Sequence, residues 1–210
     1  MVEADAKLLD RDYTIILVRL SERECPAPPG LRKQWQVAEK SILNLAAKCE
    51  KFDPDGLTIY IADRPFRKYS HEDSCTLAML FQDDYSTART DLVEALKDCL
   101  QDYFDRKAQG TAKANGEMIV VILDHEPIGK DCRKALVSTL VQTTHKVDRD
   151  DEIGVMFAQV GDNMIARGFL QALDDDLHLA GAKYDITDTK LLAELPQDKV
   201  TDFLLLALTD

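Results

Sequence analysis

The sequence predicts an α/β fold in which helices cover both faces of a mostly parallel sheet, giving a three-layer sandwich. Short apolar runs, each too short for a helix, alternate along the chain with longer segments of helical periodicity. Parallel strands need crossover connections, so this alternation places the strands in one sheet and the helices outside it. One pair of runs is too close in sequence for a crossover, which predicts one antiparallel edge strand.

Four runs have the composition of central strands, and most of their residues are apolar on both faces, as expected for strands buried between two helical layers. They cover residues 13–18, 57–62, 118–123 and 153–160. Residues 66–69 follow the second run after only Asp63-Arg64-Pro65, so we expect them to form the antiparallel arm of a hairpin. A further short strand is expected at residues 183–186.

Five segments between the strands place apolar residues at steps of three and four, which gathers them on one helical face. They cover residues 35–49, 92–103, 130–146, 163–173 and 198–208. The polar stretch 107–116 contains glycine and is expected to be a surface loop. No linker divides these elements, so we expect a single domain over residues 1–210.

The composition argues against several classes of function. Of 210 residues, 45% are hydrophobic, and 26 Lys+Arg against 38 Asp+Glu give a net charge of −12. This acidic balance opposes binding to nucleic acid. The N-terminus lacks the basic start and apolar run of a secretory signal, and no apolar run approaches the roughly 20 residues of a membrane span. We therefore expect a cytoplasmic protein without a membrane segment.

Motifs of common enzymes are missing from the sequence. No two glycines are separated by a single residue, which excludes the dinucleotide fingerprint, and no Gly-x-Ser-x-Gly motif is present. Five cysteines are widely spaced without a Cys-x-x-Cys pair, so zinc and redox chemistry are not indicated. Oxygen donors do follow the expected strands: Ser21 and Glu22 come after the first, Thr90 precedes a helix, and Asp124 follows residues 118–123. Such groups are ligands for Mg²⁺.

Four segments resemble a von Willebrand factor type A domain of the bacterial, stand-alone, intracellular kind, whose fold is Rossmann-like. The resemblance covers essentially the whole chain and is carried by residues 11–16, 52–58, 90–92 and 121–127. It implies binding of a protein partner through a metal ion-dependent adhesion site, which consists of an Asp-x-Ser-x-Ser motif, a Thr and an Asp. Carried over by position, the Thr matches Thr90 and the final Asp matches Asp124.

The first motif of the adhesion site departs from the family pattern. Val18, Leu20 and Glu22 stand at the positions of Asp, Ser and Ser, with Arg19 and Ser21 between them. Two hydrocarbon side chains cannot replace oxygen ligands, and they raise the cost of holding a cation nearby. The resemblance therefore implies a degenerate site, composed of residues 18–22, Thr90 and Asp124, in which no metal or other cofactor is expected.

Several interpretations remain open at this point. Glu22, Thr90 and Asp124 form an alternative Mg²⁺ or Mn²⁺ site. Arg19 either pairs with Asp124 in place of the ion or is solvated, and Thr90 is either a site residue or a helix cap. His125 is expected to be a solvent-exposed loop residue rather than a ligand.

The function expected from this site is that of a non-enzymatic protein-interaction or assembly subunit. An intact relative in a hetero-assembly is one hypothesis for the partner. The first alternative is a divalent-cation-dependent binding module, and the second is a metal-dependent hydrolase on the same fold.

Overall fold

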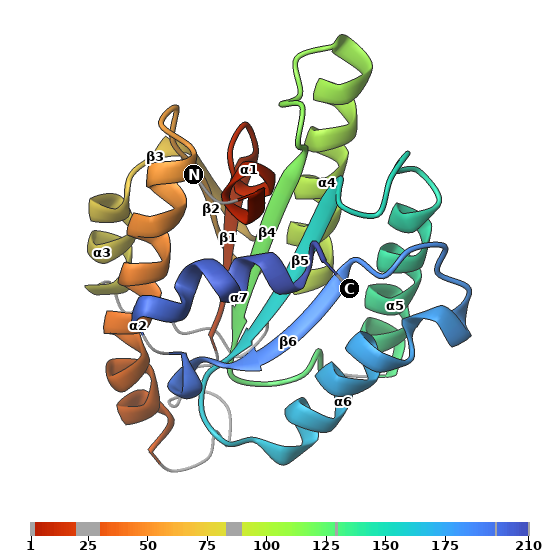
Figure 1. The fold of residues 1–210 in the computed structure, drawn as a ribbon. Coiled ribbons are helices and arrows are strands. Elements are labelled where there is room, and N and C mark those ends of the chain that lie inside the picture. Colours follow the sequence, from red (N-terminus) through yellow and green to blue (C-terminus); the bar gives the residue numbers. More distant parts are fainter. Residues whose placement is uncertain (1–2, 20–29, 83–89, 129, 196, 210) are drawn as a thin grey trace.

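The computed structural model in Figure 1 shows a central sheet with helices packed on both faces, as the sequence predicts. It describes residues 3–19, 30–82, 90–128, 130–195 and 197–209. In this part of the chain, no helix is both long enough and apolar enough to cross a membrane.

The sheet has six strands in the order β3-β2-β1-β4-β5-β6. Its strands are β1 (Asp12–Val18), β2 (Leu57–Ile61), β3 (Arg67–Glu72), β4 (Glu117–Leu123), β5 (Ile153–Gln159) and β6 (Thr187–Leu191). All neighbouring pairs are parallel except β2 and β3, which confirms the predicted hairpin and its antiparallel edge. Every residue of β4 and β5 is buried, because helices cover both sides of these strands.

The helices divide between two apolar cores, one on each face of the sheet. One core is covered by α1 (Glu3–Leu8), α2 (Leu31–Phe52), α3 (Ser74–Gln82) and α7 (Val200–Leu206). The other is covered by α4 (Leu92–Gln109), α5 (Lys130–Thr144) and α6 (Met164–Asp175). Side chains alternate along each strand, so Ile15 and Leu17 face the first core while Ile16 and Val18 face the second.

Two predictions about the elements were wrong. The last strand is β6 at Thr187–Leu191 rather than residues 183–186, although Val155 N already donates to Ile186 O at 2.7 Å. Strand β6 lies at an edge of the sheet, and most of its residues are polar. It therefore lacks the run of apolar residues by which the central strands were predicted. Helix α4 continues to Gln109 and takes the first residues of the expected 107–116 loop, and the short α1 and α3 were not predicted.

The strand order reverses between β1 and β4. The chain moves from β1 to β2 on one side of β1, and the later strands β4, β5 and β6 lie on the other side. Loops that follow adjacent strands leave the sheet in opposite directions at such a point, which is where ligands bind in open α/β sheets. In this chain the residues immediately after these strands are Arg19 and Asp124.

Candidate functional site

Arg19 and Asp124 lie side by side at the C-terminal edge of the sheet. Val18 pairs with Leu123 in the parallel register of β1 and β4, so the residues that follow them occupy neighbouring positions. Arg19 therefore lies next to Asp124, the residue that the resemblance matches to the final Asp of an adhesion site.

Both carboxylate oxygens of Asp124 receive N–H donors from the protein itself. Trp35 Nε1, in the second turn of α2, donates to Oδ2 at 2.5 Å, and His125 Nδ1 contacts Oδ1. All three residues are at most 5% exposed. A buried carboxylate is stabilised by such donors, and its lone pairs on these sides are then unavailable to a metal ion.

His125 extends this arrangement to Thr90. A carboxylate only accepts hydrogen bonds, so His125 Nδ1 carries the proton that faces Asp124. The opposite nitrogen of the ring, Nε2, lies within hydrogen-bonding distance of Thr90 Oγ1, at 3.1 Å. The prediction of an exposed His125 was wrong, because the ring is 5% exposed and bonded on both sides.

Thr90 is not the cap of helix α4. The N-cap position is Asp91, whose backbone N–H donates to Ala62 O at 2.9 Å and whose side chain forms no capping bond. The hydroxyl of Thr90 is directed instead to His125. Thr90 thus joins the Asp124 arrangement through the imidazole and is partly exposed.

The first-motif residues that the structure describes do not provide oxygen ligands. Val18 is 1% exposed and belongs to the core beneath α4. The guanidinium of Arg19 lies over the Trp35 ring, 5.7 Å from its centroid. Leu20, Ser21 and Glu22 lie outside the described residues.

The direct ion pair considered between Arg19 and Asp124 is not formed in the described part of the chain. The ion pair is absent because the indole N–H of Trp35 donates to Asp124 Oδ2, while the face of the same ring contacts the guanidinium of Arg19. Trp35 therefore connects the cation and the carboxylate. A cation–π contact of this kind contributes about 1 kcal/mol.

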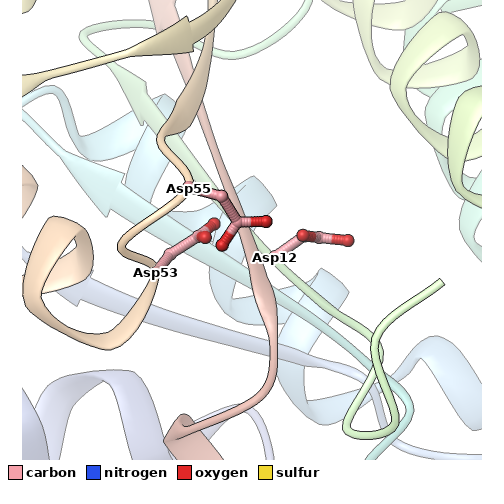
Figure 2. Close-up of side chains that lie close together, drawn as sticks. All are labelled: Asp12, Asp53 and Asp55. Carbon is pink, nitrogen blue, oxygen red and sulfur yellow. The ribbon is translucent and has the colours of Figure 1, made fainter. Parts of the chain in front are cut away.

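A second group of carboxylates lies at the opposite, N-terminal edge of the sheet. Asp12 begins β1, and Asp53 and Asp55 lie in the turn between α2 and β2, so the parallel register brings them together. Figure 2 shows the three side chains close to one another, and carboxylate oxygens from all three lie within 4.8 Å. Sequence reasoning missed this cluster as a site, although adjacent parallel strands that both begin beside Asp residues were a usable signal.

An ammonium group already holds this acidic cluster together. Lys113 Nζ, from the loop before β4, lies 2.7 Å from Asp55 Oδ1, 3.2 Å from Asp12 Oδ1 and in contact with Asp53 Oδ1. Burial raises the pKa of Asp53 to about 6 despite Lys113, whereas the hydrogen bond from Lys113 lowers the pKa of the exposed Asp55. The chain's own lysine thus supplies the positive charge at a position that could otherwise hold a metal.

No protein-family model and no curated protein matches the chain. Solved structures of proximal thread matrix protein 1 from the mussel byssus are similar in fold. One matches with a TM-score of 0.52 at 12% identity over 94% of this chain and 47% of that one. Another, with a zinc-occupied MIDAS motif, matches with a TM-score of 0.53 at 11% identity over 95% of this chain and 46% of that one.

The chain therefore spans about half the length of those structures, and the similarity concerns the fold. It agrees with the topology described above: a mostly parallel sheet, one antiparallel edge strand and helices on both faces. The chain has the α/β fold of von Willebrand factor type A-like domains.

Proposed function

We propose that this chain is a non-enzymatic protein-interaction domain that recognises its partner at the C-terminal edge of the sheet without a metal ion. The observation that carries the proposal is the state of Asp124: Trp35 and His125 donate to its two oxygens. A Mg²⁺ ion bound there would have to displace these buried donors and would find the hydrocarbon of Val18 where an oxygen ligand is needed.

The comparisons support an interaction role at the level of the fold. The similar structures are of a byssus matrix protein, and one of them holds zinc in its MIDAS motif. In our proposal this chain keeps the scaffold, as a single domain, and replaces the ion. A bacterial, cytoplasmic setting and a hetero-assembly with an intact relative remain part of the proposal, and co-purification of the native protein tests the latter.

Thermal unfolding with and without divalent ions tests the metal-free site. A ligand that binds only the folded state raises the melting temperature, so millimolar Mg²⁺ or Mn²⁺ is expected to leave it unchanged relative to EDTA. The Asp55→Asn variant serves as a control, because it weakens the carboxylate cluster at the opposite edge. A rise in melting temperature that persists in Asp55→Asn and vanishes in Asp124→Ala would instead establish the divalent-cation module.

A second candidate function is hydrolysis, favoured by the Thr90–His125–Asp124 arrangement. A hydroxyl, an imidazole and a carboxylate bonded in this order can activate a nucleophile, since His125 Nε2 is placed to take the proton of Thr90 Oγ1. Turnover of p-nitrophenyl acetate separates the two functions. The interaction proposal expects wild type and Thr90→Ala to be equally slow, whereas hydrolysis requires Thr90→Ala and His125→Gln each to abolish turnover.

A further inference from the structure

We propose that Arg19 is the cation that binds a carboxylate side chain of the partner. The inference rests on the proposed function and names the partner chemistry: an acidic residue, Asp or Glu, flanked by apolar residues. The argument depends on the contacts of Arg19, the charges around it and the apolar side chains at the same edge of the sheet.

Arg19 is a positive charge without a carboxylate among the described residues. Its guanidinium lies over the Trp35 ring, and Arg19 lines a small cavity together with apolar side chains and Asp63, whose carboxylate pairs with Arg67. A cation–π contact uses the face of the ring and leaves the guanidinium N–H groups able to donate. A carboxylate accepts two such bonds in parallel, which gives both affinity and orientation.

Three carboxylates near this edge already have donors of their own. Asp124 accepts from Trp35 and His125, and Asp63 pairs with Arg67. Asp162, in the turn after β5, accepts from Gln34 Nε2 at 3.1 Å. None of these three carboxylates forms an ion pair with Arg19, so the guanidinium N–H groups can donate to a carboxylate of the partner.

Other positive charges surround the same corner of the molecule. Lys33 lies in the first turn of α2, which contains no acidic residue, and Arg64 lies in the turn between β2 and β3. Cations at a helix N-terminus oppose the helix dipole, so this placement does not favour the helix itself. In a chain with a net charge of −12, these cations close to Arg19 are complementary to an acidic partner.

Apolar side chains are exposed on the loops that follow the neighbouring strands. Ile128, after β4, is 54% exposed, and Met164 and Ile165, in the first turn of α6 after β5, are 70% and 66% exposed. Large apolar residues at a binding edge commonly contact a partner. The expected partner segment therefore combines a carboxylate for Arg19 with apolar neighbours for these residues.

The single tryptophan provides a local reporter for the test. Acetyl-Leu-Asp-Leu-amide is titrated into the full chain in EDTA while the fluorescence and the indole N–H NMR signal of Trp35 are followed, and acetyl-Leu-Asn-Leu-amide is the matched probe without charge. We expect the Asp peptide to shift both signals in a saturable way and the Asn peptide to bind at least tenfold more weakly. Arg19→Gln is expected to weaken binding of the Asp peptide by at least tenfold, and Arg19→Lys is expected to weaken it by less.

Lys51→Gln is the matched control, because it removes one positive charge from the opposite end of α2. It is expected to bind like wild type, and melting curves establish that each variant is folded. Equal responses to the two peptides, no response of wild type at millimolar peptide, or a folded Arg19→Gln variant with wild-type binding would each overturn the inference. The metal-free site is tested separately by the divalent-ion melts, so the Arg19 inference can fail while the proposed function stands.

Discussion

The two edges of the sheet differ in how their buried carboxylates are compensated. Each edge holds buried carboxylate oxygens, which are costly unless they are compensated. At the N-terminal edge, three carboxylates surround the ammonium of Lys113. At the C-terminal edge, one carboxylate receives two N–H groups, and a nearby cation, Arg19, contacts an aromatic ring. In the described part of the chain, groups of the protein itself thus compensate the carboxylates at both edges, and in our proposal Arg19 at the C-terminal edge binds the partner.

The N-terminal edge contains further buried ionic groups that are fully paired. Glu117 accepts from Thr14 at 2.5 Å and pairs with Arg106 at 2.6 Å, and Glu152 pairs with Lys107 at 2.6 Å. Burial raises the pKa of Glu117, and Arg106 opposes that rise. Such a network rigidifies a structure only when every member is satisfied. We infer that this edge serves stability and that the other serves recognition.

The largest expected effect follows from removing the ammonium of the N-terminal edge. Lys113→Met leaves Asp53, which is 1% exposed, without its cation. We expect the free energy of unfolding at pH 7 to fall by about 3 kcal/mol, measured by urea denaturation, because breaking a buried pair exposes the desolvation cost of the remaining charge.

The pH dependence of this variant has a defined sign. Burial already places the folded-state pKa of Asp53 at about 6, above its ordinary value of 3.8, and the loss of Lys113 raises it further. The folded state then binds more protons than the unfolded state, so the deficit shrinks as the pH falls from 7 toward 4. The double variant Lys113→Met/Asp53→Asn is expected to recover part of the loss, and a deficit independent of pH would contradict the account.

An intermediate effect is expected at the C-terminal edge. Asp124→Ala leaves the buried N–H groups of Trp35 and His125 without their acceptor, which costs about 2 kcal/mol of unfolding free energy in EDTA. If Asp124 were instead a metal ligand without donors from the protein, its removal would leave the unfolding free energy in EDTA unchanged. The exposed Asp175→Ala is the control and is expected to change stability little.

The smallest effect concerns a carboxylate whose neighbours are acids rather than an ammonium. Burial and the charge of Asp188 raise the pKa of Asp174 to about 6. Ionisation of Asp174 therefore destabilises the fold as the pH rises through this range. Asp174→Asn is expected to increase stability by about 1 kcal/mol at pH 7, after allowance for solvent screening, and by nothing at pH 4. Equal gains at both pH values in thermal melts would exclude this cause.

The central strands and most helices could be predicted because their periodicity is local. The edge strand β6 could not be predicted, because it consists mostly of polar residues and only part of it is buried. The position of Asp124 and Thr90 at one edge followed from strand order, but their partners did not. Trp35 and Asp124 are separated by 89 positions and Lys113 and Asp53 by 60, and no local pattern reports such contacts. A lone His after a strand likewise does not reveal whether its ring is buried.

The indole N–H signal of Trp35 in the ¹⁵N-labelled chain tests the metal-free site most directly, because this group donates to the carboxylate that a bound ion would need. Paramagnetic Mn²⁺ broadens signals close to where it binds. Titration with millimolar Mn²⁺ is expected to leave the linewidth of this signal unchanged relative to Mg²⁺. Selective broadening of the Trp35 indole, abolished by Asp124→Ala in a folded variant, would show that the ion is retained and would contradict the account.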